Sequence, residues 1–198
     1  MKAFIQFPVL VATLAGQAYA AVNVFMTITD ATTANTIVTD ASSTTLVKNA
    51  IELSTWSFGT EQTINLSSQS SGAGAGKIKF DSFSFTKPVD GNTNVIFNRM
   101  AQGRANTVNV YFFKSSGGAT ASTTPYMTLQ FRLAAFFSQS LSGTDGGDVP
   151  MESTSFEYGA MQISYATQNN QGVLANPTTL GWNAVKNMPE TSAVPKTT

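Results

Sequence analysis

The chain has 198 residues, no cysteine and no histidine, and its 11 basic and 11 acidic residues give a formal net charge of +0. An exported form would contain no disulfide and would be held by packing alone, and the lack of histidine excludes Ser-His-Asp and Cys-His catalysis and nearly all zinc sites. There is no basic cluster, so the electrostatic footprint of a nucleic-acid-binding protein is missing.

The first twenty residues have the layout of a secretory signal peptide. Lys2 precedes an apolar run from Phe4 to Leu14, and small residues occupy the positions before the expected cleavage between Ala20 and Ala21. This run is shorter than the roughly 20 residues that cross a bilayer, and no later segment is long and apolar enough. The sequence therefore predicts removal of residues 1–20, no integral membrane segment, and export to the periplasm or the extracellular space.

The mature chain opens with β patterns. Residues 21–29 alternate, with Val22, Val24, Met26 and Ile28 on one side, which predicts the first strand. A small strand is expected near Ile37. Another strand is expected over residues 50–58, where both faces contain apolar side chains.

Residues 67–87 contain a bare segment followed by an aromatic strand. Between 67 and 76 every residue is Ser, Gln, Gly or Ala, so this part has no apolar surface to bury and is predicted to be a long extended loop. The strand expected over 78–85 changes its alternation at Asp81 and Ser82, which predicts a bulge or a strand that turns between two sheets.

The second half combines one helix with more strands. Residues 92–103 show an apolar stripe at helical spacing, with Asn92 or Thr93 as the expected cap and Gly103 at the end. Strands are predicted over 107–114, 125–139, 154–168 and 180–185, and the third of these changes its alternation after Gly159, which indicates a bulge or a corner. Residues 188–198 read as a disordered tail.

These patterns predict one mainly β domain over residues 21–187. About eight strands, one flanking helix and no internal repeat are expected. Long strands that change phase are typical of a small antiparallel β-barrel.

Three patterns invite a chemical interpretation, and each fails a specific requirement. The segment GAGAGK at 72–77 lacks both the first glycine and the Ser or Thr of a phosphate-binding loop, and it precedes a strand instead of a helix. Asp145, Asp148 and Glu152 lack EF-hand spacing, so they read as a solvated acidic loop and not as a calcium site. Glu152 and Glu157 could be a glycosidase pair only if their separation in space were right, which a sequence does not fix.

Three stretches in order carry a resemblance to one family. They are Trp56-Ser57-Phe58-Gly59, then Gly74-Ala75-Gly76-Lys77 leading into FDSFSFTK at 80–87, then Gly181-Trp182-Asn183. With the order of elements from about Val22 to Asn187, they make the chain similar to the haemolysin-coregulated protein (Hcp) family, the inner-tube subunit of type VI secretion systems.

The resemblance implies a β-barrel subunit that forms homohexameric rings, stacks into a hollow tube, and carries small secreted effectors in the lumen. It implies no catalytic site and no cofactor. In the family the long loop contacts neighbouring subunits. The expected subunit-interaction loop here consists of Ser68, Gln69, Ser70, Ser71, Gly72, Gly74, Gly76 and Lys77.

The predicted signal peptide departs from the family, whose ordinary members assemble in the cytoplasm without one. It indicates an exported relative that builds a ring or tube in the periplasm or outside the cell. A second function from a different class stays open at this point, namely an exported monomeric β-barrel that binds glycans or peptides on an aromatic surface.

Overall fold

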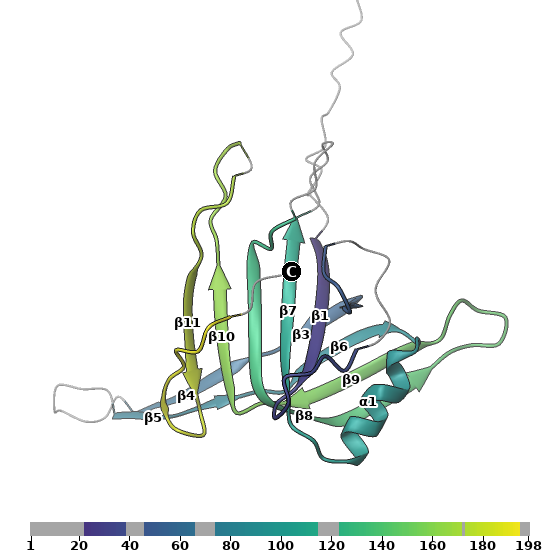
Figure 1. Cartoon of the computed structure of the whole chain (residues 1–198). Helices are drawn as coiled ribbons and strands as arrows, with labels where there is room; N and C mark the ends of the chain where they lie inside the picture. Colours follow the sequence, from purple (N-terminus) through teal and green to yellow (C-terminus); the bar gives the residue numbers. More distant parts are fainter. Residues whose placement is uncertain (1–21, 39–45, 66–73, 115–122, 172, 195–198) are drawn as a thin grey trace, which may run out of the picture.

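The computed structural model describes residues 22–38, 46–65, 74–114, 123–171 and 173–194. This part of the chain contains twelve strands and one helix, arranged in two sheets that share one long strand and in a separate hairpin (Figure 1). The predicted signal peptide, residues 1–20, lies outside the described residues.

The first sheet, sheet A, joins seven strands in the order β12-β11-β10-β8-β7-β1-β2, all antiparallel to their neighbours. The predicted alternation of the first strand is confirmed where Val24, Met26 and Ile28 are buried in the core. The strands are β1 (Val22–Asp30), β2 (Ile51–Glu52), β7 (Asn106–Lys114), β8 (Met127–Ser142), β10 (Ala160–Tyr165), β11 (Thr178–Asn183) and β12 (Met188–Pro189).

The second sheet, sheet B, contains the end of β8 together with β9 (Met151–Glu157), β6 (Phe83–Pro88) and β3 (Thr55–Ser57). Up to Ala134 strand β8 pairs with β7, and from Ala135 it pairs with β9. Leu133, just before this change, has a positive φ of 53°, a conformation that costs a non-glycine residue energy and bends the strand. In Figure 1 the strands of sheet A stand upright while β6 and β9 cross them.

The core lies between the two sheets and is dominated by aromatic rings. Phe83 on β6, Phe131 on β8 and Phe156 on β9 are fully buried, and their ring centroids lie 5.0–5.3 Å apart. Each such ring stabilises the fold by about 1.5–3 kcal/mol through burial alone. The aromatic residues of the WSFG stretch join this cluster, because the ring centroids of Trp56 and Phe58 lie 6.4 and 6.3 Å from that of Phe83.

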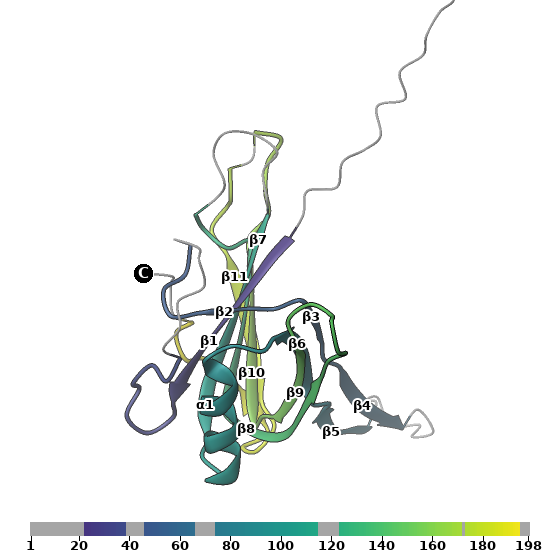
Figure 2. The same ribbon diagram turned by 90° about the vertical axis from the view of Figure 1, so that its right-hand side faces the viewer.

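The helix α1 (Asn92–Ala101) packs on β8 and is visible from the side in Figure 2. Ile96 is buried and Met100 packs against the core, as the helical stripe predicted, and Gly103 ends the helix with a φ of +59°. The expected cap is wrong: the helix begins after Gly91, and no side chain of Asn92 or Thr93 caps it.

The prediction of a barrel is wrong, because the sheets remain open. Sheet A ends on β12 at one side and on β2 at the other, and among the described residues these two edges do not pair with each other. The difference arises where strands bend. A bent strand such as β8 continues from sheet A into sheet B, so neither sheet closes on itself. The mainly β, antiparallel class with a single helix is confirmed.

Several predicted strands divide at these corners, so the count exceeds eight. Residues 50–58 become β2 in sheet A and β3 in sheet B, and the predicted corner at Gly159 separates β9 from β10. Strand β4 (Thr60–Asn65) was not predicted, because its sequence is polar. Near Ile37 there is only an isolated bridge between Thr29 and Thr36.

Gly181 in the GWN stretch is required for close packing of β11 on β10. A Cβ at this position would lie 2.5 Å from the carbonyl oxygen of Met161 and closer still to Cγ of Gln162. We expect Gly181→Ala to lower the free energy of unfolding by about 1–3 kcal/mol, since backbone must move to admit the methyl group. Urea unfolding checks this, with Gly146→Asn as a control in an open loop, and equal stability of Gly181→Ala and the natural protein would contradict it.

Candidate interaction surfaces

Hydroxyl groups occupy the middle of the solvent-facing side of sheet B, and Met151 and Glu157 lie on the same side at the two ends of β9. Two cross-strand rows run over β3, β6, β9 and the end of β8, and successive residues of each row are paired in the sheet register. We call this surface the hydroxyl face. Its residues are Ser57, Ser84, Ser155 and Ser138 in one row and Thr55, Thr86, Ser153 and Ser140 in the other.

Hydrogen bonds connect neighbouring members of the hydroxyl face. The hydroxyls of Thr55 and Thr86 lie 2.8 Å apart, as do those of Ser84 and Ser155. No residue in the two rows carries a charge. The side chains of the two rows are short, polar and uncharged. They can therefore form many weak hydrogen bonds with water or with a passing molecule, but no ion pair.

The hydroxyl face was missed from the sequence, although the pattern is present there. The stretch FSFTK at 83–87 alternates phenylalanine and hydroxyl side chains before Lys87, and in β9 the outward Ser153 and Ser155 alternate with the buried Thr154 and Phe156. In a strand successive side chains point to opposite sides, so the buried aromatic residues fix which side the hydroxyls take. Only the pairing of four strands, which is nonlocal, places them in rows.

The opposite side of sheet B contains a buried ion pair. Nζ of Lys87 lies 3.0 Å from Oε2 of Glu152, and neither side chain is exposed to solvent. Thr93 on α1 donates to Oε2 of Glu152 at 2.6 Å, and Thr154 and Gln139 donate to Oε1 at 2.7 and 2.9 Å. This network fastens the start of α1 to sheet B, which gives the lysine of the FSFTK stretch a structural role.

The acidic residues considered as sites are therefore not brought together. Glu152 is buried, which corrects its assignment to a solvated loop, whereas Asp145 and Asp148 are exposed. Glu152 and Glu157 lie five positions apart on one strand, so they point to opposite sides about 17 Å apart along it, too far for a glycosidase pair. The described residues contain no cluster that could hold a metal ion.

A second ion pair fastens the other end of α1. Asp30 at the end of β1 accepts hydrogen bonds from the backbone N–H groups of Thr32 and Thr33, and its Oδ2 lies 2.8 Å from Nη2 of Arg99. Arg99 also donates to Asn106 at 2.9 Å. The helix is thus held to both sheets by ionised carboxylates.

These carboxylates make the stability dependent on pH. Burial raises the pKa of Glu152, but hydrogen bonds from Thr93, Thr154, Gln139 and Lys87 outweigh it and leave the pKa below its ordinary value of 4.5. The hydrogen bonds to Asp30, from backbone and from Arg99, likewise lower its pKa well below the ordinary 3.8.

Because both pKa values are lower in the folded than in the unfolded chain, their contribution is complete above about pH 5 and is lost as the pH falls through the folded values. We expect the urea midpoint to be constant from pH 7 to 5 and to fall steeply towards pH 3. The Asp30→Asn variant should show a shallower fall. A midpoint that rises on acidification would contradict this account.

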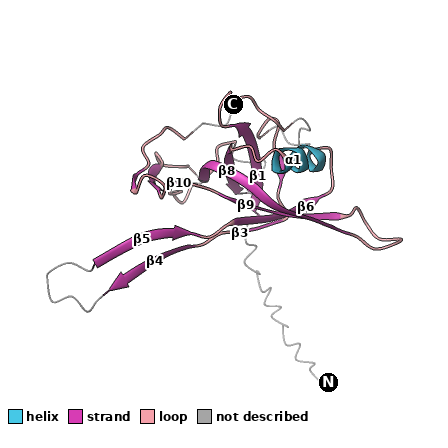
Figure 3. Cartoon of the chain, turned by 90° about the horizontal axis from the view of Figure 1, so that it is seen from below, coloured by secondary structure: helices cyan, strands magenta, loops and turns pink. Residues whose placement is uncertain are grey.

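The hairpin formed by β4 (Thr60–Asn65) and β5 (Gly74–Phe80) projects from the body as its own two-stranded sheet (Figure 3). Of the expected interaction loop, Gly74, Gly76 and Lys77 lie in β5, so this part is strand and not loop. The other members, Ser68, Gln69, Ser70, Ser71 and Gly72, lie outside the described residues. The predicted loop is therefore shorter at its end than expected, and its contacts with other subunits stay a prediction.

Two groups of exposed apolar side chains lie on opposite sides of the molecule. Ile163 and Tyr165 on β10 and Leu180 on β11 are 40%, 46% and 76% exposed, although all three point to the core side of sheet A. Phe97 on α1 and Leu141 at the end of β8 are also more than half exposed, and Figure 1 shows α1 and this end of β8 on the side away from β10 and β11. We call these two surfaces the β10–β11 surface and the helix surface.

One family model matches most of the chain. A family model described as "Type VI secretion system effector, Hcp" matches residues 25–165. No curated protein matches the chain. No helix of the described part is long and apolar enough to cross a membrane.

Solved structures share the fold. A structure described as a type six secretion system protein superposes with a TM-score of 0.69 at 22% identity, covering 84% of this chain and 99% of its own. Hcp1 from Salmonella typhimurium gives 0.62 at 18% identity, covering 84% and 99%, and a type VI secretion system effector from Yersinia pestis gives 0.56 at 15%, covering 80% and 98%. At these identities the likeness concerns the fold.

Proposed function

The chain belongs to the Hcp family of type VI secretion system proteins, and on that basis we propose that it is a structural subunit that assembles into homohexameric rings. The proposal extends to stacking of the rings into a hollow tube that carries effectors in its lumen. The match of the family model to residues 25–165 is the observation that carries this proposal. It involves no catalytic step and no cofactor.

In a ring of identical subunits, each subunit contacts the next one head to tail. Each subunit therefore needs two different surfaces that fit each other, one for each neighbour. The β10–β11 surface and the helix surface are our candidates for this pair, since each contains exposed apolar side chains and they lie at opposite sides. The hairpin of β4 and β5 adds an arm that reaches beyond the subunit (Figure 3). We assign to it, and to its segment from Ser68 to Lys77, contacts with neighbouring subunits.

The hydroxyl face is our candidate for the wall of the lumen. A channel wall must let cargo pass, so it should bind weakly and carry little charge of either sign. The eight Ser and Thr residues of this face satisfy that condition. A wall with strong apolar or ionic contacts would retain its cargo instead.

Export through a cleaved signal peptide is part of the proposal. Residues 1–20 would be removed before Ala21, one residue ahead of β1, leaving residues 21–187 as the Hcp-like domain in the periplasm or outside the cell. The intact mass of the protein from its native host tests this. A mature N-terminus at Ala21 is expected, and an N-terminus at Met1 in the cytosol would contradict export.

Electron microscopy tests the assembly itself. Negatively stained images of the purified protein should show rings with a central hole, or tubes built from them. The monomeric binding module left open by the sequence would instead show small single particles at every concentration, and that result would overturn the proposal.

A further inference from the structure

The hairpin of β4 and β5 meets the body of the protein at a narrow junction. Phe58 and Gly59 lead into β4, and Asp81 follows β5. The backbone N–H of Asp81 donates to the carbonyl of Gly59 at 2.9 Å. A Cβ at position 59 would lie 2.6 Å from Oδ2 of Asp81, so this close approach needs glycine unless the carboxylate moves. A single residue pair keeps the two strands together but leaves the hairpin free to rotate about it, since a few residues between elements are enough to form a hinge.

Aromatic side chains on both strands of the junction attach the hairpin to the core. Phe58, just before β4, stacks on Phe83 with 6.3 Å between the ring centroids. Phe80, the last residue of β5, stacks on Tyr158 at 5.2 Å with 23° between the ring planes. Tyr158 lies at the corner between β9 and β10. The hairpin is therefore held to the body at two separate points, one on each strand.

Tyr158 is itself packed in the core. Its ring lies edge-on to Phe131, with 4.6 Å between the centroids. Burial, together with the negative charge of Asp81, raises the pKa of Tyr158 to about 12, so the phenol is neutral at physiological pH. Its hydroxyl oxygen is buried and has no hydrogen-bond partner among the described residues. The contact with Phe80 therefore depends on the ring of Tyr158 and not on its hydroxyl group.

We propose that Phe80 and Tyr158 form a clamp that fixes the direction in which the hairpin projects from the body, with Gly59 and Asp81 as the hinge. Phe58 holds the strand that enters the hairpin, and the clamp holds the strand that leaves it. While both contacts are made, the hairpin does not rotate about the hinge.

Opening the clamp releases the direction of the hairpin without separating its strands, because the pairs Glu61–Lys79 and Gln62–Ile78 lie beyond the hinge. An arm that is already held in one direction loses less conformational freedom when it binds another molecule. The clamp thus prepares the hairpin for binding before any partner arrives. This inference does not rest on the proposed function, because the direction of the arm is a property of the single chain.

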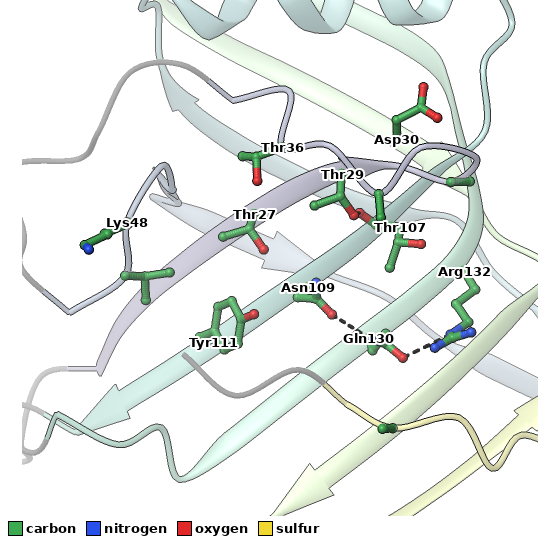
Figure 4. Close-up of a pocket in the computed structure, with 14 residues that line it drawn as sticks. Thr27, Thr29, Asp30, Thr36, Lys48, Thr107, Asn109, Tyr111, Gln130 and Arg132 are labelled. Atoms are coloured by element: carbon green, nitrogen blue, oxygen red, sulfur yellow. Dashed lines mark hydrogen bonds between the residues drawn. The ribbon is translucent and has the colours of Figure 1, made fainter. Parts of the chain in front are cut away.

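Spin labels measure the direction of the hairpin. The natural chain has no cysteine, so labels can be attached in the Lys77→Cys/Thr107→Cys variant, one on β5 and one on β7. Lys77 is exposed, and Thr107 lines a cavity of about 390 Å³ on the outer side of sheet A, which leaves room for a label (Figure 4). Double electron–electron resonance on labelled protein diluted with unlabelled protein reports distances within one chain, whether or not subunits associate. We expect one main distance.

Phe80→Ala in this labelled background should raise the fraction of molecules outside the main distance about fivefold or more, as expected for the loss of a stacked aromatic pair. Two variants serve as matched controls. Tyr158→Phe keeps the ring of the clamp. Ile78→Ala shortens a neighbouring side chain of β5, and of the two apolar residues described in this strand Phe80 packs against the core whereas Ile78 does not. Both controls should keep the natural distribution of distances.

A second label pair, Glu61→Cys/Lys77→Cys, shows whether the hairpin itself stays folded. These positions lie on the two paired strands, so dipolar broadening of the continuous-wave spectrum should persist in Phe80→Ala. An unchanged distance distribution in Phe80→Ala would overturn the clamp, and so would a distribution that is equally broad without this substitution. Loss of the dipolar broadening in Phe80→Ala would also overturn it, because Phe80 would then hold β4 and β5 together instead of fixing their direction.

Discussion

Replacing Lys87 with methionine is expected to lower the free energy of unfolding by about 3–5 kcal/mol, because Glu152 would keep a buried negative charge without its cation. In the natural protein Nζ of Lys87 lies 3.0 Å from Glu152 and 2.6 Å from Asp90. The side chains of Lys87 and Glu152 are both fully buried, so water cannot replace the missing partner. Urea unfolding followed by tryptophan fluorescence measures the loss.

Two further variants separate the buried charge from other effects of the substitution. Lys87→Met/Glu152→Gln should recover most of the stability, since the amide still accepts from Thr154 and no unpaired charge remains. Lys79→Met is the matched surface control, because the two ion pairs of Lys79 are long and exposed, and it should cost less than about 1 kcal/mol. A similar loss for Lys79→Met and Lys87→Met, or a double variant no more stable than Lys87→Met, would contradict this explanation.

Removing the outer part of the hairpin is expected to abolish assembly while leaving the fold intact. Residues 63–77 can be replaced by Asn-Gly, which forms a two-residue turn and preserves the pairs Thr60–Phe80, Glu61–Lys79 and Gln62–Ile78. Among the described residues, β4 and β5 pair with each other as a two-stranded sheet and with neither of the other two sheets. Size-exclusion chromatography with light scattering should therefore find a monomer, with the urea midpoint of the natural protein.

A length-matched variant distinguishes the reach of the arm from its sequence. Substitution of residues 68–71 by alternating Glu and Lys keeps the length of the hairpin but changes the side chains of its loop. We expect weakened assembly if the loop itself makes contacts, as proposed for Ser68 to Gly72. Rings formed by the hairpin deletion would refute the assignment of this arm to subunit contacts.

Local patterns predicted much of the fold. Alternation located β1, β7 and β8, and the helical stripe located α1. The phase changes at Asp81 and Gly159 marked the breaks between β5 and β6 and between β9 and β10. These predictions succeed because apolar residues must face the core. The spacing of the apolar residues then shows whether the local backbone is a helix or a strand. Strand β4 failed this test, since its sequence TEQTIN has no apolar alternation and it pairs only with β5 in a hairpin of its own.

The barrel was predicted wrongly because closure is not a local property. A change of phase shows that a strand bends, but it does not show which sheet the strand enters next. At Leu133 and Gly159 the chain passes from one open sheet to the other. The apolar residues of the sequence alternate in the same way at such a corner as at the corner of a barrel. The solvated position predicted for Glu152 was wrong for the same reason. In the sequence Glu152 follows a glycine-rich acidic segment, and its burial becomes clear only from the register of β6 and β9, which pairs it with Lys87.

The mass of the assembled protein tests the central claim most directly. Native mass spectrometry of the purified full-length or processed chain, at concentrations up to the millimolar range, should find a species with six times the mass of the subunit. The hairpin deletion, measured alongside, should remain at one subunit. A natural protein that stays monomeric over the whole concentration range would contradict its function as a ring subunit.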